Sequence, residues 1–224
     1  MPSLDHSTAT RVARYFDRVA PFYDTVTAAP GVYSPNRVVR GLLHGRLRAG
    51  IRAIDIGAGT GQTIAVLVPP LRAADVLAVD PSGAMLGACA ARFPGASVFM
   101  GTLDEARTAG LNLSAGLITC VGAFEFIAEP SAFLASCASC LQPGGLLVFT
   151  HEVLDLTDPA RTAPHWSEGD GAGRLEHRRD LPADVSRWLA EAGLLTLLVR
   201  EFTAYEVAGV PVVFRAILAN RHSG

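Results

Sequence analysis

AIDIGAGTGQ, residues 53–62, is the most informative stretch of this 224-residue sequence. Its apolar first half is typical of a buried strand, and the alternating Gly57, Gly59 and Gly61 are typical of a tight turn into a helix. Because glycine accepts positive φ angles and has no side chain, backbone N–H groups in such a turn can approach a ligand at the helix N-terminus. The stretch therefore predicts a strand, a turn and a helix, with a ligand site at the turn.

Short apolar runs alternate with helical patterns along the rest of the chain. The expected strands span residues 51–56, 76–80, 97–100, 117–121, 146–150, 194–203 and 210–219. The expected helices between them span residues 62–68, 82–93, 103–109, 131–141 and 182–192. This alternation predicts an α/β fold with a doubly wound, mostly parallel sheet that has helices on both faces.

Two segments fall outside the alternation. Residues 1–50 precede the first strand and are expected to form an N-terminal helical cap on the domain of residues 51–224. Residues 152–181 contain three glycines and two prolines among clustered charges, and they are expected to form a long loop. Loops of that length in a compact domain are usually functional, so this segment is a candidate lid. We interpret the chain as one domain overall.

Composition excludes several classes of function. All 19 basic residues are arginine, so no lysine is present for a Schiff base or for a phosphate-binding Gly-Lys-Ser/Thr loop. With a net charge of −2, the chain lacks the excess of positive charge that is typical of proteins that bind nucleic acid or an anionic membrane. Four cysteines are too few for a disulfide scaffold, and no apolar run is long enough to span a bilayer. These features predict a soluble, cytoplasmic protein with no nucleic-acid or membrane partner, and they leave a homodimer open.

The spacing of glycines and acids indicates which nucleotide the turn could bind. Asp80 ends the second expected strand, where a carboxylate can accept both hydroxyls of a ribose. A dinucleotide site requires a third glycine three positions after the second, but Gln62 stands there and Gly61 comes one residue early. Asp55 precedes the turn, where its charge would repel a pyrophosphate and suit an ammonium group.

Five motifs together carry a resemblance to a known family. They are RYFDRVAPFYDTV (14–26), IDIGAGTGQT (54–63), AVDPSGAML (78–86), ITCVGAFEFI (118–127) and LQPGGLLVFT (141–150). In these motifs, over roughly residues 10–220, the chain resembles the class I S-adenosylmethionine-dependent methyltransferases that act on small molecules. The resemblance implies a seven-stranded sheet with an antiparallel last strand. It also implies S-adenosylmethionine as the cofactor and S-adenosylhomocysteine as its product.

The resemblance also implies a set of cofactor-binding residues. The methionine moiety would lie along Asp55, Gly57, Ala58, Gly59 and Gly61, with Tyr23 closing over it. Asp80 would hold the ribose, and Pro81, Met85, Gly101, Thr102 and Leu103 would surround the adenine. Cys120 and Val121 would face the sulfonium. Thr102 departs from the acidic residue that is usual in the family, and Gly116 replaces an aspartate often found before the fourth strand.

Catalysis in such a site needs alignment of the acceptor with the methyl group, and a base only where the acceptor must lose a proton. His151 and Glu152 follow the fifth strand and are the candidate catalytic residues, with Glu125 as a third. HEVLD lacks the second histidine of a zinc-binding helix, so no metal site is expected.

The sequence therefore predicts methyl transfer from S-adenosylmethionine to O, N or C of a small organic acceptor, such as a biosynthetic intermediate. Two alternatives stay open. One is a module that binds S-adenosylmethionine without transferring a methyl group, and the other is a nicotinamide-dependent oxidoreductase, which Gln62 disfavours.

Overall fold

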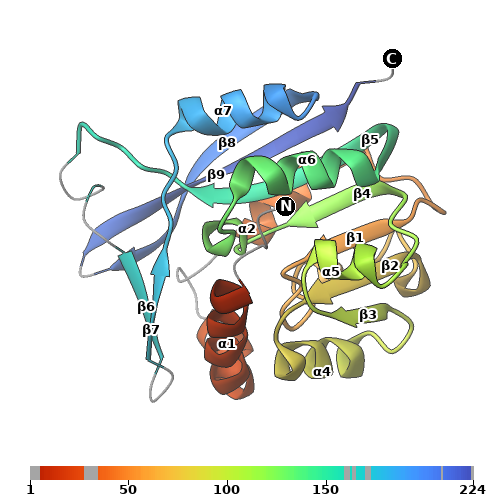
Figure 1. Ribbon diagram of the computed structural model, residues 1–224, viewed down its shortest axis with the longest axis horizontal. Coiled ribbons are helices and arrows are strands. Elements are labelled where there is room, and N and C mark those ends of the chain that lie inside the picture. The colour runs from red at the N-terminus through yellow and green to blue at the C-terminus, as the bar shows by residue number, and fades with distance from the viewer. Residues whose placement is uncertain are drawn as a thin grey trace.

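The computed structural model of the protein describes residues 6–27, 35–158, 162, 165–169, 173–207 and 209–222. A seven-stranded sheet runs through the molecule in the order β3-β2-β1-β4-β5-β9-β8 (Figure 1). Its strands are β1 (Ala53–Ile56), β2 (Val76–Asp80), β3 (Ser97–Met100), β4 (Ala115–Cys120), β5 (Leu141–Glu152), β8 (Leu194–Val207) and β9 (Val210–Arg221). The first five strands are parallel, whereas β9 lies antiparallel between β5 and β8. The predicted doubly wound α/β fold with an antiparallel last strand is confirmed.

Helices cover both faces of the sheet (Figure 1). They are α1 (His6–Thr27), α2 (Pro35–Leu43), α3 (Ile64–Leu67), α4 (Gly83–Arg92), α5 (Leu103–Thr108), α6 (Pro130–Cys140) and α7 (Pro182–Glu191), with the short 3₁₀ helices η1 (Ala73–Asp75) and η2 (Phe124–Phe126). One apolar cluster joins the sheet to α5, α6 and α7, and a second joins it to α2, α3 and α4.

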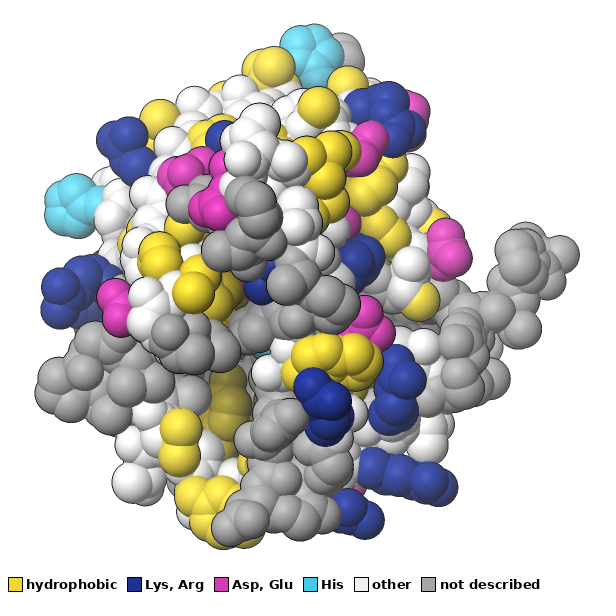
Figure 2. Space-filling model, turned by 90° about the vertical axis from the view of Figure 1, so that its left-hand side faces the viewer, with side chains coloured by type: hydrophobic (Ala, Val, Ile, Leu, Met, Phe, Trp, Pro, Cys, Tyr) yellow, Lys and Arg dark blue, Asp and Glu magenta, His cyan; other side chains and the backbone are white. Residues whose placement is uncertain are grey.

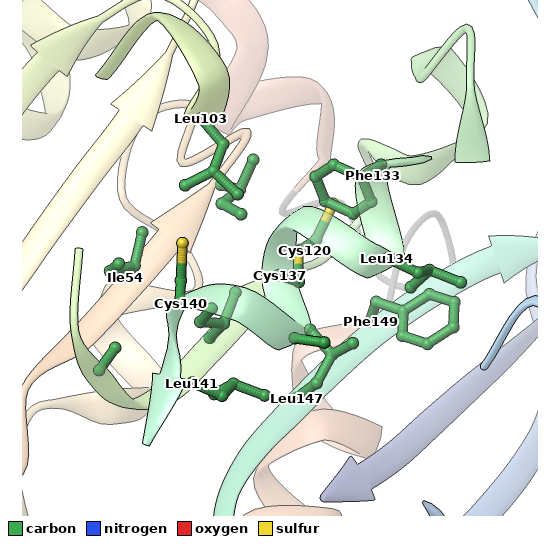
Figure 3. Packing of buried hydrophobic residues seen from close by; sticks show 14 of the residues in the cluster. Ile54, Leu103, Cys120, Phe133, Leu134, Cys137, Cys140, Leu141, Leu147 and Phe149 are labelled. Atoms are coloured by element: carbon green, nitrogen blue, oxygen red, sulfur yellow. The ribbon is translucent and has the colours of Figure 1, made fainter. Parts of the chain in front are cut away.

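There are two clusters because successive side chains along each strand point to opposite faces of the sheet. In β1, Ile54 and Ile56 belong to the first cluster, while Ala53 belongs to the second. Figure 3 shows the first cluster, in which Phe149 of β5 and Leu134 of α6 lie close together. Both faces of the strands are therefore apolar, as buried parallel strands require.

The segment predicted as a loop, residues 152–181, contains regular structure. An antiparallel hairpin is formed by β6 (His165–Gly169) and β7 (Gly173–His177), so the expectation of an unstructured loop is wrong there. Leu175 of β7 is buried against Val12 and Tyr15 of α1, which gives the hairpin an apolar anchor. Because the segment is rich in glycine and charged residues, its sequence does not indicate that Leu175 is buried.

α1 lies beside both this hairpin and α4, at the edge of the sheet where the parallel strands end (Figure 1). It runs over 22 residues and lies within the segment predicted as a helical cap. Within the described ranges, no helix combines the length and the apolar character that a bilayer crossing needs.

Candidate functional site

A cavity of about 170 Å³ lies at the carboxyl ends of β1, β2 and β4. Ligand sites of open α/β sheets lie at this edge. Eleven of the predicted cofactor-binding residues line the cavity, namely Tyr23, Gly57, Ala58, Gly59, Asp80, Pro81, Met85, Gly101, Thr102, Leu103 and Val121. On the face that carries the β6–β7 hairpin, the surface is hollowed and hydrophobic side chains are visible inside the hollow (Figure 2).

Asp80 is held in one orientation by two backbone groups. Gly59 N–H donates to its Oδ2 at 2.8 Å, and Ser82 N–H donates to its Oδ1 at 2.8 Å. Burial raises the pKa of Asp80, and these two hydrogen bonds act in the opposite direction. Each carboxylate oxygen keeps a further lone pair, so Asp80 can still accept hydrogen bonds from a ligand diol in the cavity.

The glycine turn adopts the predicted left-handed backbone, with φ of +67° at Gly57 and +54° at Gly59. Its amides differ from the expectation, because Gly57 N–H and Ala58 N–H both donate to Val79 O, at 2.8 and 3.2 Å. These hydrogen bonds hold the turn against β2. A ligand can come close to the backbone of the turn, but the N–H groups of Gly57 and Ala58 are already used. A Cβ at Gly57 would lie 2.3 Å from Ala123 Cβ, so the turn also touches the loop after β4.

Asp55 is buried beside the cavity and does not line it. It pairs in register with Thr119 of β4, whose hydroxyl donates to Oδ1 at 2.7 Å. Oδ2 has no hydrogen-bond partner among the described residues. Burial raises the pKa of Asp55 to about 7, against the lowering effect of the Thr119 hydrogen bond. A cationic group placed at Oδ2 would satisfy this oxygen and stabilise the carboxylate.

Three other predicted cofactor residues have structural contacts. A Cβ at Gly61 would lie 2.9 Å from the Phe93 ring, so this glycine lets the turn pack on the end of α4. Cys120 lies in the core shown in Figure 3, and only its neighbour Val121 lines the cavity. Thr102 forms a capping box at α5, in which its hydroxyl accepts from Glu105 N–H at 3.2 Å. The T-x-x-E spacing is a sequence signal for this cap.

α1 covers the cavity through Tyr23, which was among the predicted site residues, and through Phe16, Asp17 and Asp24, which were not. Phe16 and Tyr23 line the cavity from above. Asp17 accepts from Ser82 Oγ at 2.6 Å and from the N–H of Ala84 at 3.1 Å, at the start of α4.

Asp24, about two turns after Asp17 on α1, binds residues of the glycine turn. Its Oδ1 accepts from Thr60 Oγ1 at 2.5 Å and from Gln62 Nε2 at 2.8 Å. Asp17 and Asp24 are seven residues apart and so share one face of the helix. The two carboxylates therefore attach α1 to both loops that bound the cavity, and Gln62 has a role in this attachment.

The two candidate catalytic residues are buried and do not line the cavity. The His151 ring lies near Phe124 and Phe149, and its Nε2 has no hydrogen-bond partner in the part of the chain that the structure describes. Burial lowers the pKa of His151 to about 4, so the ring is neutral at pH 7. Glu152 is paired with Arg179, and its Oε2 lies 3.4 Å from His177 Nδ1.

Glu125 is buried next to the cavity wall, and burial raises its pKa to about 8. The folded state therefore binds a proton that the unfolded state releases above about pH 4.5. Stability is expected to fall as pH rises from 4.5 to 8. Glu125→Gln is expected to remove this dependence and to be more stable than the wild type at alkaline pH, by about 1–3 kcal/mol.

Urea unfolding at acidic and alkaline pH measures this difference. Glu191→Gln on the exposed end of α7 is the matched control, and its stability is expected to follow that of the wild type at both pH values. Equal pH profiles for Glu125→Gln and the wild type would show that Glu125 ionises normally in the folded chain.

Two observations fit S-adenosylmethionine at this site. Asp80 presents a fixed carboxylate to the cavity, and Asp55, buried beside the cavity, has an oxygen that lacks a partner among the described residues. Across the described ranges, no group of three or more His, Cys, Asp or Glu side chains could hold a metal ion.

Comparisons with known proteins agree with this geometry. A family model described as a methyltransferase domain matches residues 54–147. An uncharacterized methyltransferase of Mycobacterium tuberculosis is 34% identical over 96 residues, which are 43% of this chain and 37% of that protein. The chain thus matches just over a third of the length of the curated relatives.

Solved structures show the fold over a longer range. A S-adenosylmethionine-dependent methyltransferase from Mesorhizobium loti superposes with a TM-score of 0.63 and 20% identity, covering 84% of this chain and 98% of that chain. The 1,6-didemethyltoxoflavin-N1-methyltransferase of Burkholderia thailandensis has a TM-score of 0.69 and 15% identity, covering 99% and 92%. The [4+2]-cyclase SpnF has a TM-score of 0.72 and 17% identity, covering 96% and 97%.

Residues 54–147 thus match a methyltransferase domain, and the sheet order is that of solved S-adenosylmethionine-dependent methyltransferases.

Proposed function

We propose that this chain transfers the methyl group of S-adenosylmethionine to a small organic acceptor. The observation that carries the proposal is the cavity in which Asp80, the glycine turn and α1 meet at the carboxyl edge of the sheet. The cofactor supplies a methyl group that is already activated on a sulfonium. The protein therefore has to hold it, align the acceptor and exclude water.

We propose a small acceptor because α1 covers part of the cavity. Asp17 and Asp24 attach this helix to the two loops that bound the cavity. The 1,6-didemethyltoxoflavin-N1-methyltransferase, whose structure holds 1,6-didemethyltoxoflavin and S-adenosylhomocysteine, shares this fold. The acceptor atom of this chain stays open among O, N and C. We place the activity in the cytoplasm because all four cysteines are unpaired and buried.

We propose His151 as the base for an acceptor that must lose a proton. Nε2 lacks a hydrogen-bond partner within the described residues and the ring is neutral at pH 7, so it can accept a proton from a group that reaches it. Burial lowers its pKa to about 4, which weakens it as a base, and it lies outside the cavity lining, so the role requires the acceptor to reach past the cavity wall. Glu152, the other predicted catalytic residue, is paired with Arg179 just after β7. We propose that it holds this segment in place and does not act as the base.

His151→Ala is expected to lower turnover by about 100-fold or more, because general-base assistance has that size. The affinity for S-adenosylhomocysteine is expected to stay within about twofold, since His151 does not line the cavity. Initial rates and calorimetry measure the two quantities. His44→Ala, at an exposed position, is the control. Full activity of His151→Ala would remove this residue from the mechanism.

The proposed function is tested with methyl-labelled S-adenosylmethionine and a panel of phenols, amines and activated carbon acids. Label is expected in at least one small acceptor and absent from added RNA or protein. Binding must be measured separately, because a protein named as a cyclase shares this fold. Saturable binding without transfer to any acceptor would favour a non-catalytic binding module, and binding of NADH in place of S-adenosylhomocysteine would favour an oxidoreductase.

A further inference from the structure

Arg178, directly after β7, binds the loop between β4 and α6 at three points. Its Nη2 donates to Phe124 O at 2.9 Å, and its Nη1 donates to Ile127 O. Its backbone N–H donates to Glu125 O at 3.0 Å, and its guanidinium lies 5.0 Å from the centre of the Phe124 ring. One residue thus engages most of the carbonyl groups of η2 and its C-terminal end.

These carbonyls belong to a wall of the cofactor cavity. Phe126 and Ile127 line the cavity, while the η2 helix that carries them is only one turn long. Its own backbone hydrogen bonds are Phe126 N–H to Ala123 O and Ile127 N–H to Phe124 O, both at 3.1 Å. A single turn leaves its terminal carbonyls without helical partners, and a cation at that end satisfies them.

Arg178 is itself fixed by Asp180. The Asp180 carboxylate accepts from Arg178 Nε at 2.8 Å and from Nη2 at 3.0 Å, in the two-pronged arrangement that restrains a guanidinium most strongly. The Asp180 backbone is bound to the end of β5, because its N–H donates to Glu152 O at 3.1 Å and its carbonyl accepts from Leu154 N–H at 3.0 Å. The guanidinium therefore bridges the sheet edge and the cavity wall.

We propose that Arg178 is a positioning residue of the cofactor site. By binding the carbonyl groups of η2 and Ile127, it holds the cavity wall formed by Phe126 and Ile127 in place. Because Arg178 directly follows β7, it also connects this wall to the C-terminal end of the β6–β7 hairpin. The hairpin in turn packs on α1 through Leu175. The inference rests on the proposed cofactor, but it concerns how this chain preorganises the site before the cofactor binds. A lysine cannot replace the guanidinium, because one ammonium group cannot span two carbonyls and a carboxylate in a fixed fork.

The inference is tested by titrating S-adenosylhomocysteine into the wild type, Arg178→Lys and Arg178→Met, together with amide hydrogen exchange of the free proteins. Arg178→Met is expected to weaken binding by about 10- to 100-fold, the effect of losing charged hydrogen bonds that hold a binding wall. Arg178→Lys is expected to lie between this variant and the wild type. In both variants amides 122–129 are expected to exchange faster, while those of β1 and β2 keep their protection.

Arg187→Met is the matched control, because Arg187 on α7 also forms ion pairs but lies on the exposed side of that helix. Its affinity and its exchange over residues 122–129 are expected to match the wild type. Where Arg178→Met fails to fold, Arg178→Lys and Asp180→Asn provide the comparison.

Two results would overturn the inference. One is affinity within about twofold of the wild type in every Arg178 variant. The other is faster exchange throughout the chain, which would show general destabilisation in place of local positioning. Failure of the wild type itself to bind S-adenosylhomocysteine would overturn the proposed function together with this inference, whereas equal binding by wild type and variants contradicts the inference alone.

Discussion

Asp80→Ala is expected to weaken the binding of S-adenosylhomocysteine by about 10- to 150-fold, or about 1.5–3 kcal/mol. The carboxylate is held by Gly59 and Ser82 in the cavity, so it can accept hydrogen bonds from a ribose diol without reorganising. Its removal eliminates charge-assisted hydrogen bonds and frees the Gly59 amide at the glycine turn. Isothermal titration calorimetry measures the affinity.

Asp75→Ala is the matched control for Asp80→Ala. Asp75 stands just before β2, at the opposite end of this strand from Asp80, and pairs with Arg72 on the surface. We expect its affinity for S-adenosylhomocysteine to equal that of the wild type. Unchanged affinity in Asp80→Ala would mean that the ribose lies elsewhere.

Gly57→Ala is expected to lower the free energy of unfolding by about 2–5 kcal/mol, because two costs add. An alanine at φ +67° carries the strain of the left-handed region, which is about 1–2 kcal/mol. Its Cβ would also lie 2.3 Å from Ala123 Cβ, and overpacking of this kind costs about 1–3 kcal/mol. Relief of the clash would push the turn away from the β4 loop, so we expect cofactor affinity to fall as well.

Gly193→Ala separates the two costs. Gly193 has φ of +70°, and a Cβ there would meet no heavy atom within 4 Å, so only the backbone strain applies. Urea unfolding of both variants measures the difference. Equal destabilisation would show that the contact between the glycine turn and Ala123 has no energetic consequence.

Much of the fold is predictable from local sequence, because several strands are apolar runs, of which the first is followed by Gly57 and the second ends at Asp80. The second strand has the bounds predicted for it, and Asp80 stands at the cavity as its position at the strand end indicated. Strand alternation also places Asp55 on the face opposite Ile54 and Ile56. The alternation gives the face of Asp55, whereas its pairing with Thr119 depends on the register between β1 and β4.

Other features depend on contacts between distant parts of the chain, which one sequence does not encode locally. Asp24 lies 36 residues from Thr60, and their hydrogen bond arises only when α1 folds over the glycine turn. Arg178 reaches Phe124 over 54 residues. Arginine and aspartate mostly lie in solvent, so the residue types alone do not indicate either contact. The hairpin depends on a distant contact in the same way, because Leu175 anchors β7 to Val12 and Tyr15 of α1.

A crystal structure of the complex with S-adenosylhomocysteine tests the central claim most directly. We predict density for the ligand in the cavity between the glycine turn and α1, with both ribose hydroxyls on Asp80 and the amino group next to Asp55 Oδ2. An empty cavity at saturating ligand, or a ligand bound away from Asp80, would contradict it.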